Sequence, residues 1–397
     1  MRILFIVDGR SPTARNWITH FFTPENQVHL ISTSKCSGIP GLASLQVLPV
    51  AFSGTGAPPT AGQPGKTGAM AALRQAAPMG LRTFIRQWLG PLTVPATTRR
   101  LQAMISEIEP DLIHAMRYPY EGILAARARQ KSDRAAPLIV SVWGNDFTLH
   151  ARSNPLIMFH TRRALHSTDA LHTDCQRDLR LARELGFSPD KPAAVLPGSG
   201  GVRASIFYPP EAPREPTPPV IINPRGFRTY IRNDSYFKAI PLVLEKYPEV
   251  RFVSPAAAHE LEAQRWVQEY GIERAVELLP LVPQGRMAEL FRQAHIVVSP
   301  STHDGTPNTL LEAMACGCFP VAGDIESIRE WLTDGENGLL VDPGDHRALA
   351  DAILRGIEDQ ALRQQAVAAN LEMIASRANY QAVMVRAGQF YAEVLAK

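Results

Sequence analysis

The chain has 397 residues, which is long for a single hydrophobic core, so we expect two domains. Its composition, 45% hydrophobic and 20% charged, is typical of an ordinary globular protein, and it contains no run of about twenty apolar residues that could span a bilayer. The net charge of +3 is small, and we expect no nucleic acid among the partners of this protein.

The first residues, MRILFIVDG, are typical of a buried strand, and their apolar run is too short for a secretory signal peptide. The four cysteines lack the spacing of a disulfide framework, and Cys316 and Cys318 are too close together for a usual zinc pair. We therefore expect structural thiols, no metal site and a cytoplasmic protein.

Short apolar runs alternate with helical stretches in the first half, which predicts a parallel-sheet α/β domain over residues 1–208. A loop rich in Gly and Pro is predicted at Phe52–Lys66, followed by an amphipathic helix at Leu81–Gly90. The predicted strands are Ile3–Val7, Val28–Ser32, Leu112–Ala115, Leu138–Val142, Ala170–Thr173 and Ala194–Leu196.

Prolines crowd residues 209–219, where we predict a linker, and a second α/β domain follows over residues 220–376. Its predicted strands are Val220–Asn223, Arg251–Ser254, Val276–Leu278, His295–Ser299, Phe319–Ala322 and Leu339–Val341. Two such domains would face each other across a ligand-binding cleft. The final segment, 377–397, predicts a helix over Tyr380–Ala396 whose apolar stripe needs a surface to cover; the stripe is Val383, Val385, Phe390, Tyr391 and Val394.

No Asp or Glu occurs from Asn26 to Ser106, although seven Lys and Arg residues do. A basic, acid-free segment such as residues 66–106 can make peripheral contact with an anionic membrane. An ordinary solvated face of the first domain is the alternative explanation.

Two acids lie eight residues apart in STHDGTPNTLLEAMACGCFPV, which runs from Ser301 to Val321. Asp304 stands in a polar loop, whereas Glu312 is surrounded by the apolar residues of a predicted helix. A carboxylate among leucines is costly unless it meets hydrogen-bond donors, and sugar or ribose hydroxyls are suitable donors. Alternatively, Asp304 only caps the helix and Glu312 pairs with an arginine of a neighbouring strand.

Thr306 is predicted to cap this helix, with Pro307 in its first position and Gly317 at its end. The free N–H groups from Asn308 to Leu310 would then point outward with the positive end of the helix dipole. They would form an anion site suited to a phosphate.

The stretch DGTPNTLLEAMACGCFPVAG resembles the mark of the family-4 glycosyltransferases, Glu-x7-Glu followed by Ala-Met-Ala-x-Gly-x-x-Pro-Val. The resemblance covers nearly the whole chain, since it continues in PDLIHA, VSVWGNDF, VLPGSGGVRASIFYP, ESIREWLTDGENGLLVDPGD and RANYQAVMVRAGQFY. It implies the GT-B fold, with two Rossmann-like domains facing across a cleft and a C-terminal helix that crosses back to the first domain. It also implies a retaining enzyme that uses a nucleotide-activated sugar.

The resemblance assigns the donor site to the second domain. Glu312 is then the ligand of the nucleotide ribose, and Asp304, one methylene shorter than the usual Glu, contacts the sugar. Arg225 takes the place of the family's diphosphate arginine, but Tyr230 stands where a lysine is usual. The implied catalytic residues are Asp304, Arg225 and Glu312, and the implied donor-binding residues are Arg225, Arg228, Arg232, Asp304, Gly305, Thr306, Pro307, Asn308, Thr309, Leu310 and Glu312.

The acceptor side is implied to lie in the first domain, where the chain departs from its relatives. The loop DGRSPTARNW replaces a Gly-Gly loop, and His114-Ala-Met replaces the common His-x-His, so we expect His114 to be structural. Trp-Gly-Asn-Asp at residues 143–146 is a variant of His-Gly-x-Asp that resembles surface-polysaccharide enzymes. The implied acceptor-side residues are Arg10, Ser11, Met116, Arg117, Trp143, Asn145 and Asp146.

We therefore expect transfer of a hexose-type sugar from a nucleotide sugar to a glycan, a lipid-linked glycan or a small acceptor, without metal or cofactor. No protein nucleophile stands out, which fits a front-face mechanism in which the donor diphosphate takes the acceptor proton. The expected location is the cytoplasm, including its membrane face. The alternatives are a non-catalytic nucleotide-sugar-binding partner protein and a nucleotide-sugar epimerase on the same scaffold.

Overall fold

A computed structural model describes residues 1–50, 94–118, 120–129, 136–211 and 218–397. The contacts within it divide the chain into two compact units. The first unit contains Met1–Asp174, Asp178–Ser199 and Ala387–Lys397, and the second contains Cys175–Arg177 and Gly200–Arg386. The loop predicted at 52–66, the helix predicted at 81–90 and most of the predicted linker lie outside the described residues.

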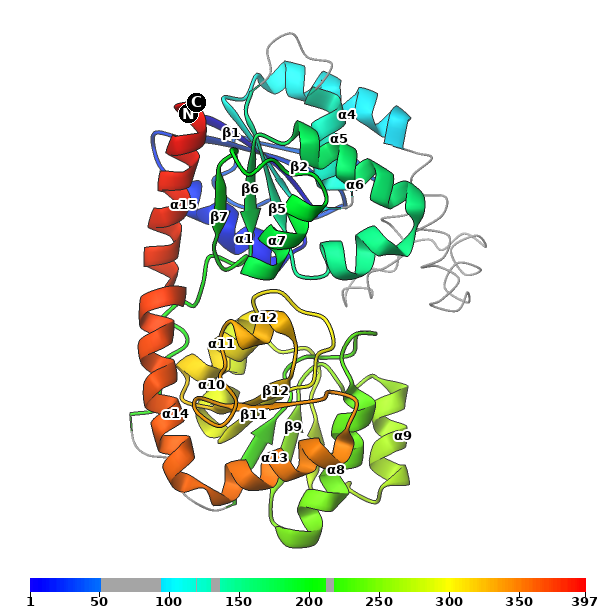
Figure 1. Cartoon of the computed structure of the whole chain (residues 1–397), viewed down its shortest axis with the longest axis vertical. Coiled ribbons are helices and arrows are strands. Elements are labelled where there is room, and N and C mark those ends of the chain that lie inside the picture. Colours follow the sequence, from blue (N-terminus) through cyan, green and yellow to red (C-terminus); the bar gives the residue numbers. More distant parts are fainter. Residues whose placement is uncertain (51–93, 119, 130–135, 212–217) are drawn as a thin grey trace. The chain divides into compact units, whose positions relative to one another are not determined.

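In the described part of the first unit, seven parallel strands form one sheet in the order β3-β2-β1-β4-β5-β6-β7 (Figure 1). The strands are β1 (Arg2–Val7), β2 (Gln27–Ser32), β3 (Ser44–Val47), β4 (Leu112–Met116), β5 (Leu138–Val142), β6 (Ala170–Thr173) and β7 (Ala193–Val195). Most were predicted within a residue because a parallel strand covered on both faces is a continuous apolar run. The strand β3 was missed, since its four residues SLQV alternate in polarity and none is fully buried.

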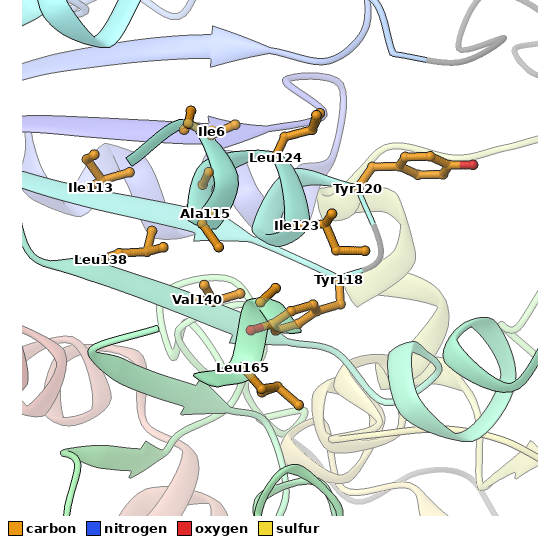
Figure 2. Close-up of a cluster of buried hydrophobic side chains, with 14 of the residues drawn as sticks. Ile6, Ile113, Ala115, Tyr118, Tyr120, Ile123, Leu124, Leu138, Val140 and Leu165 are labelled. Atoms are coloured by element: carbon orange, nitrogen blue, oxygen red, sulfur yellow. The ribbon is translucent and has the colours of Figure 1, made fainter. Parts of the chain in front are cut away.

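Helices cover this sheet and follow its strands in chain order (Figure 1). They are α1 (Pro12–Ile18), α4 (Val94–Ile108), α5 (Glu121–Arg129), α6 (Pro155–Ser167) and α7 (Gln176–Glu184), with a π-turn at Asp146–His150 and short 3₁₀ turns at Thr19–Phe21 and Ala151–Ser153. Figure 2 shows the core between sheet and helices, where Ala115 and Val140 of neighbouring strands meet Ile123 of α5 and Leu165 of α6.

The second unit repeats this plan, with six parallel strands in its described part in the order β10-β9-β8-β11-β12-β13. They are β8 (Val220–Ile222), β9 (Arg251–Ser254), β10 (Val276–Leu278), β11 (Ile296–Ser299), β12 (Phe319–Gly323) and β13 (Leu339–Val341). The helices are α8 (Asn233–Lys246), α9 (Leu261–Glu269), α10 (Gln284–Gln293), α11 (Asn308–Ala315), α12 (Glu326–Arg329), α13 (His346–Glu358) and α14 (Gln360–Met373), which a π-turn at Ile374–Ala378 joins to α15 (Tyr380–Leu395).

Each sheet has a point where its strand order reverses, between β1 and β4 in the first unit and between β8 and β11 in the second. In open parallel sheets, ligands bind at the carboxyl ends of the strands beside such a point, because the connections there leave in opposite directions. The loops that follow β8 and β11 contain Arg225 and Asp304, so the topology places these two residues at the carboxyl edge of the second sheet, beside its reversal point.

The end of α15 belongs to the first unit, and it is tied to the sheet by a buried chain of hydrogen bonds. Its members, in order, are Trp17, Tyr391, His114, Ser141, His172 and the carbonyl of Leu196, and the successive distances are 3.0, 2.5, 2.6, 2.7 and 3.0 Å. His114 is fully buried, so its predicted structural role is confirmed. The predicted stripe of α15 was wrong at Val385, which is 57% exposed, because Met384 and Ala387 face the core in its place.

Candidate functional site

Three side chains meet at the carboxyl edge of the second sheet. The guanidinium of Arg225 donates from Nη2 to Oδ2 of Asp304 at 2.5 Å and from Nη1 to Oγ1 of Thr309 at 2.7 Å. The side chains of Arg225 and Asp304 are only 8% and 15% exposed. Asp304 therefore does not cap α11, as the alternative prediction had it, but forms a largely buried ion pair.

The loop that carries Asp304 is also held through its backbone. Ser327 Oγ donates to the carbonyl of Asp304 at 2.7 Å and accepts from Nη1 of Arg177 at 3.2 Å. Glu330 in turn accepts from the N–H groups of Gln176 and Arg177 at 2.9 and 3.0 Å. None of these four residues was predicted as part of the site. Gln176 and Arg177 lie outside every motif of the resemblance, and Ser327 and Glu330 lie within one, at residues 326–345, but no role was assigned to them.

His303 is a further neighbour that the sequence did not single out. Its Nδ1 lies 2.5 Å from the carbonyl of Thr302, which can only accept, so Nδ1 carries the proton and Nε2 is the acceptor nitrogen of the ring. Burial and the charge of Arg177 lower the pKa of His303, with Asp304 acting in the opposite direction. The imidazole beside Asp304 is therefore neutral near pH 7.

Glu312 lies in the middle of α11 and is partly buried. Burial raises the pKa of its carboxyl to about 7, and a hydrogen bond from the side chain of Gln284 acts in the opposite direction. Among the residues that the structure describes, Glu312 forms no ion pair with an arginine, so the alternative of an arginine from a neighbouring strand was wrong. A carboxylate with so few donors keeps acceptor capacity for the hydroxyls of a ligand.

The start of α11 differs from the prediction by one residue. The helix begins at Asn308, with Pro307 and not Thr306 at the cap position. Two of the amides that were expected to be free form hydrogen bonds within this tight turn. The N–H of Asn308 donates to the carbonyl of Thr306, and the N–H of Leu310 donates to the carbonyl of Pro307. Leu310 is fully buried as well, so the predicted anion site cannot use its amide as the helix now stands. The end of the helix was predicted correctly, with Gly317 at a φ of 78°.

Arg228 and Arg232, the other two arginines predicted to bind the donor, have other partners in this structure. Arg232 makes a paired contact with the carboxylate of Asp234, at 2.8 and 2.7 Å. Arg228 is exposed and donates to the hydroxyl of Tyr230, the residue that replaces the expected lysine. The structure thus groups Arg225 with Asp304, Gly305 and Thr309, but not Arg228 or Arg232.

A second polar cluster lies in the first unit, at the carboxyl ends of β4 and β5. Arg117 donates from Nε and Nη2 to Oδ1 of Asp146, at 3.1 and 3.0 Å, and its guanidinium lies 5.6 Å from the ring centre of Trp143. Oδ2 of Asp146 accepts from the N–H groups of Tyr118 and Trp143, both at 3.1 Å. Burial raises the pKa of Asp146 to about 7, against the effect of Arg117 and these amides.

The backbone of Arg117 has a φ of 118°, which is strained for a residue with a side chain. The conformation is held by the bonds to Asp146 and by the Arg117 N–H, which donates to the carbonyl of Ser141 at 3.1 Å. As a result the side chain of Arg117, which is 35% exposed, lies beside the indole of Trp143.

Two acceptor-side predictions are corrected by this geometry. Met116 is completely buried in β4 and cannot contact a ligand, because alternate residues of a strand point to opposite faces and Arg117 takes the exposed position. Asp146 is also 0% exposed, so it acts through Arg117 and not on a ligand.

The remaining acceptor-side candidates have local roles. Arg10 pairs with Asp8 at 2.7 Å, and the hydroxyl of Ser11 caps α1 by accepting from the N–H of Ala14. Asn145 is partly buried, and its Oδ1 accepts no hydrogen bond from the residues that the structure describes. The structure therefore brings together Arg117, Trp143 and Asp146 of the predicted set.

Comparison with known protein families decides what kind of protein has these two sheets. A family described as "Glycosyl transferase 4-like domain" matches residues 40–198, and a family described as "Glycosyl transferases group 1" matches residues 207–373. The two matches together account for most of both units. The chain belongs to the GT4-type glycosyltransferases.

Solved structures share the fold of this glycosyltransferase. Sucrose-phosphate synthase from Thermosynechococcus elongatus has a TM-score of 0.76 at 16% identity, with both chains fully covered. Anabaena HepE in complex with UDP has a TM-score of 0.71 at 16% identity, covering 99% of this chain and 100% of the other. These neighbours have the GT-B fold, as predicted from the sequence.

Curated relatives match over shorter stretches. A phosphatidyl-myo-inositol mannosyltransferase of Mycobacterium leprae is 32% identical over 137 residues, which are 34% of this glycosyltransferase and 36% of the relative. A D-inositol 3-phosphate glycosyltransferase of Acidothermus cellulolyticus is 28% identical over 219 residues, 51% of this chain and 48% of the relative. The matches thus span between about a third and a half of these relatives.

Proposed function

We propose that this glycosyltransferase transfers a hexose-type sugar from a nucleotide-sugar donor, with retention of the anomeric configuration. The observation that carries the proposal is the cluster of Arg225, Asp304 and Thr309 at the carboxyl edge of β8 and β11, with Glu312 one helix turn beyond Thr309. Solved neighbours of the same fold include Anabaena HepE in complex with UDP-glucose, which supports a donor of this class.

In this proposal the guanidinium of Arg225 binds the donor diphosphate and stabilises the negative charge that grows on it as the glycosidic bond breaks. Asp304 holds Arg225 in place and accepts from hydroxyls of the donor sugar. Glu312 accepts from the ribose hydroxyls in its charged form. In this proposal Asp304 and Glu312 bind the donor and do not attack it. The acceptor hydroxyl attacks from the face that the diphosphate leaves, and a diphosphate oxygen takes its proton.

The amides of Asn308 and Leu310, at the start of α11, already donate hydrogen bonds within the turn, and this limits how the helix can bind the diphosphate. Because Asn308 and Leu310 donate within the turn, most of the compensating charge must come from Arg225 and not from the helix N-terminus. We propose no metal or other cofactor for the donor.

The acceptor is proposed to be a lipid-linked glycan, another glycan or a small hydroxylated molecule in polysaccharide synthesis. The names of the relatives, which include a phosphatidyl-myo-inositol mannosyltransferase, support an acceptor with a lipid or a cyclitol headgroup. The partly exposed side chain of Arg117, beside the indole of Trp143, offers a hydrogen-bond donor and a stacking face for such a headgroup. We propose that the protein works at the cytoplasmic face of a membrane.

The test is a panel of UDP-, GDP- and ADP-sugars, each measured for binding, for slow hydrolysis and for transfer of labelled sugar to material in a cell extract. We expect one nucleotide class to bind and to lose its sugar. Binding without hydrolysis or transfer would favour a non-catalytic nucleotide-sugar-binding protein. Label that stays on the nucleotide in an altered sugar would favour an epimerase.

The pKa of Glu312 leads to a pH prediction for donor binding. The carboxyl must be charged to accept fully from ribose, and it is half protonated near pH 7 in the free protein. The dissociation constant for a nucleotide sugar should therefore fall as the pH rises from 6 to 8, by up to about tenfold. A nucleotide sugar is the correct probe because its diphosphate diester does not titrate in this range.

The matched variant for this prediction is Glu312→Gln, which keeps the shape of the side chain and removes its titration. Calorimetric titrations should give weaker binding that no longer changes between pH 6 and 8. If the variant kept the pH dependence of the wild type, another group would be responsible and the role of Glu312 would be refuted.

A further inference from the structure

The helix α6 in the first unit has an outer face that the donor and acceptor sites do not use. Its inner face is anchored in the core, where Leu165 is fully buried (Figure 2). On the opposite side Phe159 is 56% exposed, and Leu156, one turn earlier, is 38% exposed. Large apolar side chains at adjacent turns of one exposed helix face form a continuous apolar strip.

Arginines surround this strip. Arg152, Arg162 and Arg163 are exposed, and Arg127 of α5 lies close enough to Arg163 that the two charges repel. None of these four arginines makes an ion pair with any residue that the structure describes. From residue 147 to residue 168 the sequence contains no Asp or Glu, so α6 brings no acid of its own to neutralise them.

In the described residues around α6, Asp146 and Asp169 do not pair with these arginines. His160 on the same helix also has a lowered pKa, because of burial and of the charges of Arg127 and Arg163. The nearby acids are already engaged, since Asp146 pairs with Arg117 and Asp169 pairs with Arg129.

We propose that the outer face of α6, formed by Leu156, Phe159, Arg162 and Arg163 together with Arg152 of the preceding 3₁₀ turn, docks on the surface of an anionic phospholipid membrane. The unpaired guanidiniums match lipid phosphates and acidic headgroups, and each basic residue near such a surface strengthens the attraction. The apolar strip distinguishes a membrane from a soluble polyanion, because only a bilayer offers hydrocarbon to Phe159 and Leu156. The inference does not depend on the identity of the donor.

The start of α6 lies at the same edge of the first sheet as the acceptor-side cluster. The helix runs antiparallel to the strands and begins soon after β5, so its first turn lies at the carboxyl edge of the sheet. Arg117 and Trp143 lie at the same edge. A membrane held by Leu156 and Phe159 would therefore bring lipid headgroups to the acceptor-side cluster.

The test is flotation of the full chain with vesicles of phosphatidylcholine alone and of phosphatidylcholine mixed with phosphatidylglycerol, at low and at high salt. We expect binding to the mixed vesicles only, weakened by salt. Arg162→Gln/Arg163→Gln should lower the partition coefficient by roughly 30-fold. Phe159→Ser should lower it by roughly tenfold, because an inserted aromatic ring is lost.

Matched controls lie on exposed positions of the second unit. Arg265→Gln/Arg274→Gln makes the same change in net charge, and Leu281→Ser removes an apolar side chain that is 83% exposed; both should bind like the wild type. Thermal midpoints of all variants should agree, since none of the changed side chains is buried. The proposal is overturned if the wild type does not float with anionic vesicles, or if the α6 variants float as the wild type does. It is also overturned if Phe159→Ser has no effect while soluble heparin abolishes binding, which would indicate a polyanion surface.

Discussion

Replacing Arg225 by lysine is expected to lower kcat/KM for the nucleotide-sugar donor by about 100- to 1000-fold. The guanidinium reaches Asp304 and Thr309 at the same time, at 2.5 and 2.7 Å, and still has a buried Nε without a partner. An ammonium group has one centre of charge and no planar fork, so it cannot keep both contacts while it binds a diphosphate. The loss should fall mainly on kcat, because charge builds up on the diphosphate in the transition state.

A matched control for this variant is Arg228→Lys. Arg228 is exposed and its contact is with Tyr230, so we expect less than about a threefold change in kcat/KM. Initial rates over a range of donor concentrations measure both effects. If Arg225→Lys stayed within a factor of a few of the wild type, Arg225 would not be the diphosphate ligand.

The second large effect is expected on stability. Tyr391→Phe should lower the free energy of unfolding by about 3 kcal/mol, because it leaves two buried polar groups without a partner. These groups are Nε1–H of Trp17, which donates to the Tyr391 hydroxyl, and Nδ1 of His114, which accepts from it.

The hydrogen bonds that join Trp17 to the carbonyl of Leu196 can be donated in only one direction. The indole N–H of Trp17 can only donate, and the carbonyl of Leu196 can only accept. Every group between them must therefore accept a hydrogen bond from the group before it and donate one to the group after it. The donors after Trp17 are then, in order, the hydroxyl of Tyr391, Nε2–H of His114, the hydroxyl of Ser141 and Nε2–H of His172. Both imidazoles are then neutral, which agrees with the effect of burial, since it lowers the pKa of His114 and brings that of His172 to about 4.

Urea denaturation of the wild type and of Tyr391→Phe measures the loss. Tyr247→Phe is the control, because the Tyr247 hydroxyl lies at the surface, 3.2 Å from Glu358, and its removal should cost less than about 0.5 kcal/mol. Equal midpoints for Tyr391→Phe and the control would show that the chain of hydrogen bonds does not stabilise the protein.

The sequence was sufficient to predict the features that depend on local pattern, namely the strands and the two parallel sheets. The apolar runs located the strands, and their alternation with helices indicated two parallel sheets, because such sheets are buried on both faces. The strand ends then placed Arg225 and Asp304 at one edge of the second sheet. Residue-level contacts were harder to predict. Arg177 and Ser327 hold the Asp304 loop from 127 and 23 residues away, and no periodicity indicates such a contact.

Two errors show where pattern reasoning fails in this chain. At the end of β4, Met116 was assigned to the acceptor side because it aligns with a family histidine, yet the strand's pleat buries it and exposes Arg117. At the start of α11, a Thr-Pro pair predicts a capped helix with free amides. The turn at Pro307 instead uses the amides of Asn308 and Leu310 internally, which depends on dihedral angles that the residue types do not determine.

The central claim is that the second unit binds the ribose of a nucleotide sugar through Glu312. The most direct measurement is calorimetric titration of the wild type and Glu312→Gln with the preferred nucleoside diphosphate and with its 2′,3′-dideoxy analogue. We predict that the substitution weakens the ribonucleotide by about 10- to 100-fold and leaves the dideoxy analogue unchanged, because the analogue has no hydroxyl to donate. Equal weakening of both ligands, or of neither, would contradict the assignment.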